Sequence, residues 1–198
     1  MSFNNAIENR RSCYQLTAEV TISDEQLQQL IEHSIKYTPS AFNSQSSRVV
    51  ILKGKEHKAL WQITAEALRS IVPTDAFHET EKKINSFAAA YGSILFFEDL
   101  DTIQSLQEQF SLYADKFPDW SEQHSGILQF IIWTALAEVG IGASLQHYNP
   151  LVDNQVRERW GLPQSWKLIA QMPFGKNSVP PAEKEFLPME ERLRVFGS

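Results

Sequence analysis

The stretch from Ser121 to Val139 constrains the fold more than any other part of the chain. From Ile127 on, its apolar side chains recur so closely that they would cover most of the circumference of a helix, and Gln129 and Glu138 interrupt this apolar run. A helix that is apolar all round is buried on every side. In a chain of 198 residues, such a helix predicts the centre of a domain or the interface of a dimer, and we expect both.

Shorter helices and a few strands are predicted on either side of this stretch. Ser23-Asp24-Glu25-Gln26 has the pattern of a capping box, and the helix that it opens should end before Pro39. Asn149 followed by Pro150 has the pattern of an N-cap and a first-turn proline, so a helix is predicted from there to Trp160. Further helices are predicted over residues 5–10, 60–71, 79–90 and 102–113, a loop over residues 116–120, and strands over residues 48–53, 93–97 and 166–172.

A single domain covering residues 1–198 is the simplest organisation. The sequence contains no internal repeat, no low-complexity segment and no flexible linker. Strands that alternate with helices usually form a parallel sheet, but here the strands are too few and the helical blocks too uneven for a doubly wound fold. Near the C-terminus, Arg194-Val195-Phe196 is a candidate edge strand.

Composition and charge exclude several classes of partner. The net charge of −6 gives no electrostatic support to binding of nucleic acid or of an anionic membrane, so we expect neither partner. The longest apolar run is too short to span a bilayer, and the N-terminus lacks the pattern of a secretory signal. The single cysteine, Cys13, rules out an internal disulfide and suits a reducing compartment, so a cytoplasmic location is expected.

The sequence lacks the common catalytic motifs. No arrangement of Cys and His residues is typical of a metal site, and neither a Gly-rich phosphate loop nor a serine-hydrolase elbow occurs. We therefore expect no metal ligand. Glu98, Asp99 and Asp101 form an acidic cluster after the second predicted strand, and a solvated turn is a commoner role for such a cluster than paired-carboxylate catalysis.

Two short polar segments carry the residues best suited to bind a small molecule. Arg10-Arg11-Ser12 follows the first predicted helix, and Pro39-Ser40-Ala41-Phe42-Asn43-Ser44-Gln45 precedes the first predicted strand. Their cations and hydroxyls suit a phosphate group, and their amides suit the polar edge of a planar heterocycle. Each segment also has a simpler interpretation, because arginines complement the dipole at a helix C-terminus and serine-rich segments form ordinary turns.

The order and spacing of these two segments resemble the nitroreductase-like flavoprotein family, and in particular its small branch of nitroreductase-related and fatty-acid-response proteins. The resemblance extends over nearly the whole chain. It implies an α+β fold with a central mixed, mostly antiparallel sheet, helices on both faces, and a C-terminal strand that is exchanged between the subunits of a homodimer. It also implies that FMN is the cofactor.

The resemblance assigns roles to the first segment. Arg10 and Ser12 are expected to bind the FMN phosphate, and Arg11 to contact the flavin or its side chain. Many larger family members have a basic residue near flavin N1 and O2 at the position that Tyr14 occupies here. A cation at that position stabilises negative charge on the reduced flavin, so its replacement bears on the flavin potential.

The second segment is expected to contact the flavin ring. By the resemblance, Asn43 and Gln45 reach a flavin that is bound mainly by the other subunit, and Pro39, Ser40 and Ala41 belong to the same contact region.

Two further places are assigned by their position in the family pattern. Leu145 and Gln146 correspond to residues whose backbone N–H groups face flavin N5 and O4, and His147 follows them. Lys184 lies where family members have a Lys or Arg that binds the phosphate. Taken alone, His147 is more typical of a surface or core-edge histidine, and Lys184 equally fits a solvated charge between two glutamates.

The resemblance implies an FMN-dependent NAD(P)H oxidoreductase. NADH or NADPH would reduce the flavin, which would then reduce nitroaromatics, quinones or similar small-molecule acceptors in a ping-pong cycle. Since the flavin carries the chemistry, no catalytic side chain is expected. One alternative is a flavin- or lipid-responsive regulatory protein with little turnover, and another is a flavin-free helical interaction module.

Overall fold

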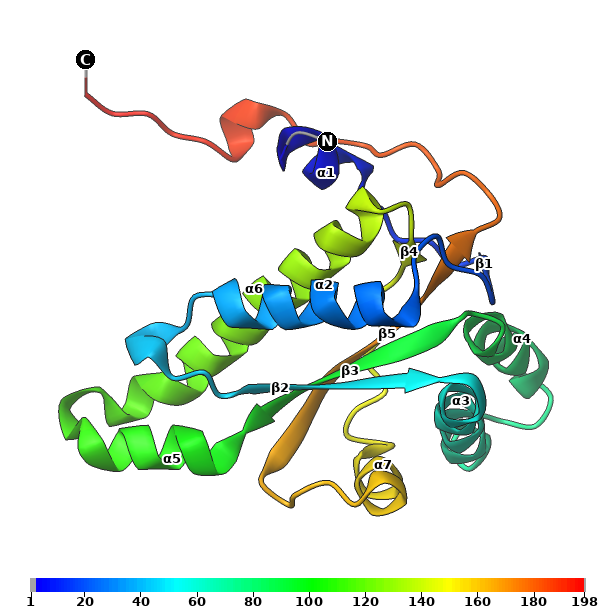
Figure 1. Cartoon of the computed structure of the whole chain (residues 1–198), viewed down its shortest axis with the longest axis horizontal. Coiled ribbons are helices and arrows are strands. Elements are labelled where there is room, and N and C mark those ends of the chain that lie inside the picture. Colours follow the sequence, from blue (N-terminus) through cyan, green and yellow to red (C-terminus); the bar gives the residue numbers. More distant parts are fainter. Residues whose placement is uncertain (1–2, 198) are drawn as a thin grey trace.

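Three long antiparallel strands form the centre of the sheet in the computed structural model, which describes residues 3–197 (Figure 1). They are β2 (Ser47–Lys53), β3 (Gly92–Asp99) and β5 (Trp166–Asn177). Two short strands, β1 (Leu16–Thr17) and β4 (Gly142–Ala143), both pair with β5, and the strand order is β1-β5-β3-β2. All of these ladders are antiparallel, and the parallel component of the predicted mixed sheet is a one-residue bridge between Ser12 and Ala143.

The central strand β3 is buried on both of its faces. Ile94 and Phe96 point to one core, and Leu95 and Phe97 point to the other, because successive side chains of a strand alternate between faces. All four are at most 2% exposed. The continuous apolar run that predicted a strand over residues 93–97 is therefore explained by helices on both sides of the sheet.

Each face of the sheet is covered by its own set of helices. The first core includes residues of α2 (Asp24–Tyr37) and α6 (Phe117–Glu138), and the second includes residues of α3 (Gly54–Arg69), α4 (Phe77–Ala88) and α7 (Asp153–Trp160). The remaining helical elements are α1 (Phe3–Asn9), α5 (Leu100–Gln109) and the 3-10 turns Ala41–Asn43, Ser111–Lys116 and Met189–Glu191. The predicted α+β fold with helices on both faces is thus confirmed.

The capping box predicted for α2 is also confirmed. The Ser23 hydroxyl accepts a hydrogen bond from the Gln26 backbone N–H at 3.2 Å, and the Gln26 side chain accepts one from the Ser23 N–H at 3.0 Å.

The long helix α6 begins earlier than the sequence suggested. Residues 117–120 were expected to form a loop, but they form its first turn, where a proline such as Pro118 is tolerated because the N–H groups there have no helical partner. Leu128, Ile132 and Leu136 are almost fully buried, as predicted, whereas Ile127 is 43% exposed. One side of α6 is therefore not covered by the described part of this chain.

The prediction for Pro150 is wrong. Pro150 does not open a helix, because it lies in the turn before α7 and its carbonyl accepts from the Asp153 N–H at 3.2 Å. The helix starts only after Val152, whose side chain is fully buried in the second core. Residues 194–196 form no strand within the described part of this chain, and a strand exchanged between subunits stays a prediction.

The segment after β5 is extended and exposed, and Figure 1 shows it passing α1 before it turns away from the body of the molecule. Phe186 and Phe196 in this segment are 71% and 90% exposed. None of the helices described between residues 3 and 197 combines the length and apolar character needed to cross a membrane.

Candidate functional site

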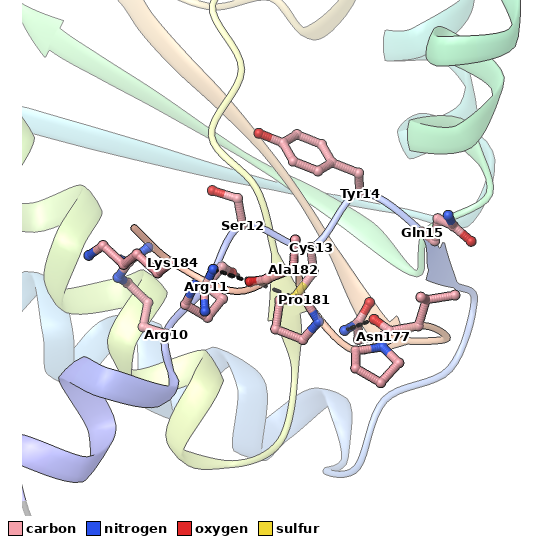
Figure 2. A pocket seen from close by; sticks show the side chains of 12 residues that line it. Arg10, Arg11, Ser12, Cys13, Tyr14, Gln15, Asn177, Pro181, Ala182 and Lys184 are labelled. Atoms are coloured by element: carbon pink, nitrogen blue, oxygen red, sulfur yellow. Dashed lines mark hydrogen bonds between the residues drawn. The ribbon is translucent and has the colours of Figure 1, made fainter. Parts of the chain in front are cut away.

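A cavity of about 410 Å³ lies between the segment that follows α1 and the segment that follows β5 (Figure 2). This volume is within the range of small-molecule sites. The residues that line it include five of the predicted site residues and several that the sequence did not single out: Arg10, Arg11, Ser12, Cys13, Tyr14, Gln15, Asn177, Val179, Pro180, Pro181, Ala182 and Lys184. The structure therefore brings Lys184 to the Arg-Arg-Ser segment from more than 170 residues away in the sequence.

Backbone pairing fixes the segment that carries the arginines. The Cys13 N–H donates to the Ala143 carbonyl at 2.9 Å, and β1 then pairs with β5 at Leu16 and Thr17. This approach requires glycine at position 175, because a Cβ there would collide with the Thr17 carbonyl oxygen. The site is thus positioned by the edge of the sheet.

Arg10 is held by an aromatic contact and is short of hydrogen-bond partners. Its guanidinium lies 4.3 Å from the ring centroid of Trp133 in α6, a cation–π geometry. Its Nε is buried and has no partner within the described residues. Burial lowers the pKa of Arg10, and the adjacent charge of Arg11 lowers it further. Both effects would be relieved by an anion, so the cavity is suited to a phosphate or carboxylate.

The neighbouring side chains differ in their role. Arg11 donates to the Ala182 carbonyl at 2.5 Å, which ties the C-terminal segment to the cavity. Figure 2 shows Ser12 and Tyr14 on the same side of the chain, as expected for alternate residues of an extended segment. Cys13 is buried, and this burial raises the pKa of its thiol, which disfavours the reactive thiolate.

The second polar segment forms a tight turn at the start of β2. Residues Ala41–Asn43 make one 3-10 turn, and the Ser40 hydroxyl accepts from the Gln45 N–H at 3.1 Å. Phe42, Asn43 and Gln45 all have positive φ angles, of 55°, 52° and 48°. The side chains of Asn43 and Gln45 are exposed and available to a ligand.

The two polar segments lie at different ends of α6. Arg10 contacts Trp133, whereas Phe42 contacts Phe117 and Trp120 in the first turn. Trp133 follows Trp120 by 13 positions in α6, which corresponds to a rise of about 20 Å along the helix axis. Pro39, Ser40 and Ala41 line a separate crevice of about 190 Å³. Within one chain, the structure does not bring the second segment to the cavity of the first.

The third predicted segment follows β4 at the edge of β5. Gln146 and Gln171 exchange backbone hydrogen bonds of 2.7 and 2.9 Å, so the Gln146 N–H is engaged within the chain. Since N–H groups alternate in direction along such a segment, the Leu145 N–H points away from β5. His147 is exposed.

One member of the acidic cluster is not solvated. Asp101 is exposed as expected, but Glu98 is 1% exposed and accepts hydrogen bonds from Ser46 and Ser47. The prediction of a solvated turn is therefore wrong for Glu98, because β3 continues inside the sheet through this residue. The third acid, Asp99, pairs with Arg48 at 2.8 Å.

Sequence reasoning also missed Trp133, which it treated only as a core residue of α6. Its contact with Arg10 joins residues more than 120 positions apart, so no local pattern indicated it. The all-round apolar pattern predicted burial for every side of this helix, whereas Trp133 is only partly buried and faces Arg10.

An antiparallel sheet between two helical layers, with a cationic cavity at its edge, defines a small-molecule-binding α+β protein. The comparisons with known proteins specify the family. The model of the nitroreductase family matches residues 7–176, and the chain belongs to this family. Membership places it among oxidoreductases of the nitroreductase type.

Individual relatives agree with this assignment over nearly their full length. The nitroreductase FRM2 of Saccharomyces cerevisiae is 36% identical over 189 residues, which cover 94% of this chain and 93% of FRM2. The nitroreductase CinD of Lactococcus lactis, solved with nicotinic acid, is 46% identical and superposes with a TM-score of 0.92, covering 99% of this chain and all of CinD. An Exiguobacterium sibiricum protein solved with FMN shares the fold at 16% identity, with a TM-score of 0.74 over 99% of this chain and 98% of its own.

Proposed function

We propose that this protein is an FMN-dependent NAD(P)H oxidoreductase that acts as a homodimer. The observation that carries the proposal is the cavity lined by Arg10, Arg11, Ser12 and Lys184, in which the buried Nε of Arg10 has no partner among residues 3–197. When bound, FMN supplies a ring that accepts a hydride equivalent and passes electrons to an acceptor. The chain's own residues bind the cofactor and orient it.

The residues of the cavity fit the phosphate end of FMN. Arg10 and Arg11 supply cations, Ser12 supplies a hydroxyl, and Lys184 supplies a further cation on the C-terminal segment. Charged donors of this kind form strong hydrogen bonds to phosphate oxygens. Trp133 holds the Arg10 guanidinium in place before the ligand arrives, which lowers the entropic cost of binding.

A second copy of the chain is part of the proposal. The turn that carries Asn43 and Gln45 packs near Trp120, whereas Arg10 contacts Trp133, about 20 Å further along α6. The two amides would therefore meet a ring held in the cavity of the partner rather than in their own. Two further observations support a partner, namely the exposed apolar side of α6 at Ile127 and the exposed apolar side chains of Phe186 and Phe196 in the C-terminal segment. We infer that this segment crosses to the other subunit.

Within each site, the remaining predicted residues would surround the ring. The Leu145 N–H is directed away from β5 and is available to the N5 side of the ring, while Gln146 keeps its N–H in the bond to Gln171. Tyr14 is 54% exposed at the cavity and supplies no positive charge. His147 is exposed close to the same turn.

The ligands of one relative support the proposed class of substrate. CinD has been solved with nicotinic acid, with chloramphenicol and with 4-nitrophenol. A nicotinamide donor and a nitroaromatic acceptor that occupy the same place in turn would give ping-pong kinetics, and quinones are flat enough to use the same place. No side-chain acid or base is required in this scheme.

An alternative function is a flavin-responsive regulatory protein with little turnover. The observation that favours it is Tyr14, because a site without a cation beside the ring stabilises the reduced flavin less. A flavin-free interaction module is a third hypothesis, under which Arg10→Ala combined with Asn43→Ala leaves ligand binding unchanged.

Reconstitution of the purified protein with FMN tests these functions. We expect one FMN per chain, a dimeric mass, and steady-state oxidation of NADH or NADPH with menadione or 4-nitrophenol as acceptor. Negligible turnover with FMN bound would favour the regulatory function. A protein that binds no FMN and oxidises neither nucleotide would refute the oxidoreductase proposal.

A further inference from the structure

The turn that carries Asn43 and Gln45 is held in a backbone conformation that side chains disfavour. Of its three residues with positive φ, only Asn43 is of a type that adopts this region readily. Phe42 and Gln45 must be held there by their surroundings, since such strain persists only where neighbouring contacts oppose it. Contacts that hold this turn are therefore a way to control where its two amides point.

The outer side of the turn is held by an aromatic cluster. The Phe42 ring lies 4.7 Å from Phe110, 5.3 Å from Phe117 and 5.9 Å from Trp120, measured between ring centroids. These rings come from α6 and from the residue before the 3-10 turn Ser111–Lys116. The cluster holds the Phe42 ring, which is 48% exposed and therefore lies on the solvent side of the turn. Other contacts must hold the opposite side.

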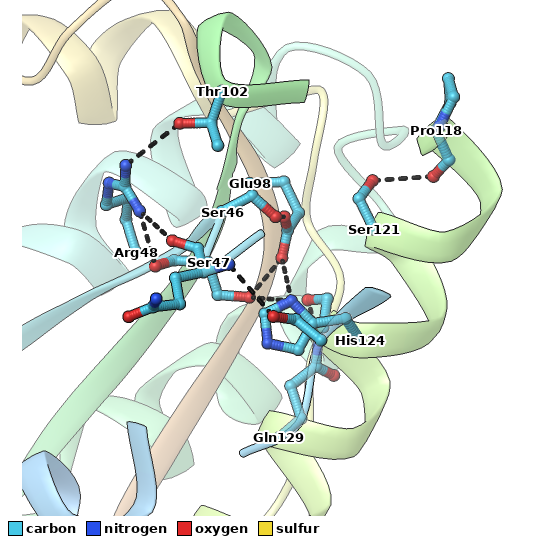
Figure 3. Close-up of polar contacts among 12 residues, drawn as sticks. Ser46, Ser47, Arg48, Glu98, Thr102, Pro118, Ser121, His124 and Gln129 are labelled. Carbon is cyan, nitrogen blue, oxygen red and sulfur yellow. Dashed lines mark hydrogen bonds and ion pairs between the residues drawn. The ribbon is translucent and has the colours of Figure 1, made fainter. Parts of the chain in front are cut away.

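The inner side of the turn is held by Glu98 (Figure 3). Ser46 and Ser47, the two residues after Gln45, both donate their hydroxyl protons to the Glu98 carboxyl group, Ser46 at 2.6 Å. Arg48 adds a hydrogen bond to the Gln45 carbonyl at 2.7 Å. The end of the turn is thus fastened directly to the central strand of the sheet.

The same carboxyl group also orients a histidine. His124 Nδ1 lies 3.3 Å from the Ser47 hydroxyl oxygen, and Ser47 already donates its proton to Glu98. His124 Nδ1 must therefore carry the proton in this contact, so the order of donation is His124 to Ser47 to Glu98. Burial lowers the pKa of His124, which favours the neutral ring. His124 lines the crevice formed by Pro39, Ser40 and Ala41.

No Lys or Arg among residues 3–197 forms an ion pair with Glu98. Among its charged neighbours, Arg48 pairs with Asp99 at 2.8 Å and Lys167 pairs with Glu122 at 2.9 Å, while His124 Nδ1 is 3.9 Å away on a neutral ring. Burial raises the pKa of Glu98. Burying a carboxyl group costs free energy, and here the Ser46 and Ser47 hydroxyls compensate part of this cost. The same two hydrogen bonds hold these serines to β3.

We propose that Glu98 is a positioning residue for the flavin ring: through Ser46 and Ser47 it fixes the strained turn that presents Asn43 and Gln45, and through Ser47 it fixes His124 beneath that turn. The proposal rests on the oxidoreductase function given above. It predicts that Glu98 governs recognition of the ring, whereas Arg10 governs recognition of the phosphate.

Binding of FMN and of riboflavin, which lacks the phosphate, separates these two roles. Glu98→Ala should raise the dissociation constants of both ligands by the same factor, about tenfold, as expected when two hydrogen bonds of ordinary strength are misaligned. It should also alter the visible spectrum and the midpoint potential of bound flavin. Glu98→Gln retains the shape of the side chain and an acceptor oxygen, so it should recover most of the affinity for both ligands. Asp101→Asn removes an exposed carboxylate of the same acidic cluster and serves as a control.

A measurement without flavin tests the positioning directly. In the flavin-free protein, amide hydrogen exchange of residues 43–46 should rise in Glu98→Ala and remain near the wild-type rate in Glu98→Gln. If Glu98→Ala does not fold, the double variant Ser46→Ala/Ser47→Ala decides, because it removes both hydroxyl contacts and leaves the carboxyl group in place. It should give the same equal weakening of FMN and riboflavin and the same rise in exchange.

The outcomes distinguish this proposal from the one on which it rests. A folded Glu98→Ala or double-serine variant with wild-type exchange, affinities and potential would overturn the positioning role. A change confined to FMN, with riboflavin unaffected, would also overturn it, because the effect would then lie at the phosphate. A wild-type protein that binds neither ligand would reject the flavin function itself.

Discussion

The cationic cavity and the turn before β2 solve two different binding problems. The cavity gathers cations on segments at the edge of the sheet, and the buried Nε of Arg10 has no partner among the described residues. The turn has a strained backbone that is fastened on one side by aromatic rings and on the other by Glu98. Charge attraction tolerates imprecise geometry, whereas hydrogen bonds to a heterocycle edge require it. The difference explains why the cavity relies on charge, whereas the turn is fastened from both sides.

The largest effect that separates the two regions is expected from Arg10→Ala. Loss of a charge-assisted contact should raise the dissociation constant of FMN by roughly ten- to a hundredfold and leave that of riboflavin nearly unchanged. Fluorescence titration of both ligands measures this ratio. Lys55→Ala removes a cation that is 92% exposed on α3 and serves as a control. Equal weakening of both ligands would show that the cavity does not hold the phosphate.

Phe42→Ala should produce the opposite pattern. The variant loses the ring contacts that hold the turn, so FMN and riboflavin should weaken alike, by about tenfold. Leu112→Ala, a change at an 80% exposed residue of the neighbouring 3-10 turn, is the matched control. An unchanged affinity for both ligands would mean that the aromatic cluster does not position the turn.

A smaller effect is expected from Trp133→Leu, which removes the aromatic support of Arg10. FMN binding should weaken by about fivefold, with no change for riboflavin, since a cation–π contact is a modest interaction. Trp133→Phe keeps a ring under the guanidinium and should retain most of the affinity. Equal FMN affinity in the leucine and phenylalanine variants would contradict a role for the aromatic face.

The smallest effect concerns stability and pH. Burial raises the pKa of Glu98 above its unfolded value, so the folded state binds a proton more readily. The stability of the wild type relative to Glu98→Gln should therefore increase as the pH falls from 7 toward 4.5 and decrease as the pH rises again. Urea unfolding of both proteins across this range measures the difference. A difference that stays constant with pH would show that Glu98 titrates normally.

The sequence predicted those parts of the molecule that depend on local patterns. The apolar run of β3, the capping box of α2 and the two polar segments were all recognised from a few consecutive residues. Lys184 could be assigned to the cavity only by the family pattern, because the residues around it carry no structural signal of their own.

Most of the features that the sequence did not predict depend on contacts between distant segments. Glu98 was expected in a solvated turn, since three acids in a short stretch are usually exposed, but its partners Ser46 and Ser47 lie some 50 residues earlier. Trp133 lies more than 120 residues after Arg10 in the sequence. Pro118 suggested a loop because proline breaks helices, although it is tolerated in the first turn.

The distance along α6 between Trp133 and Trp120 has a consequence for mixed assemblies. If every site takes its arginines from one subunit and its amides from the other, then a variant that lacks the arginine and a variant that lacks the amide should complement each other. Unfolding and refolding a mixture of the Arg10→Ala and Asn43→Ala variants would give heterodimers. In each heterodimer, one site would carry both substitutions and the other site would carry neither. With random pairing, about a quarter of all sites would be intact, whereas neither homodimeric variant has an intact site.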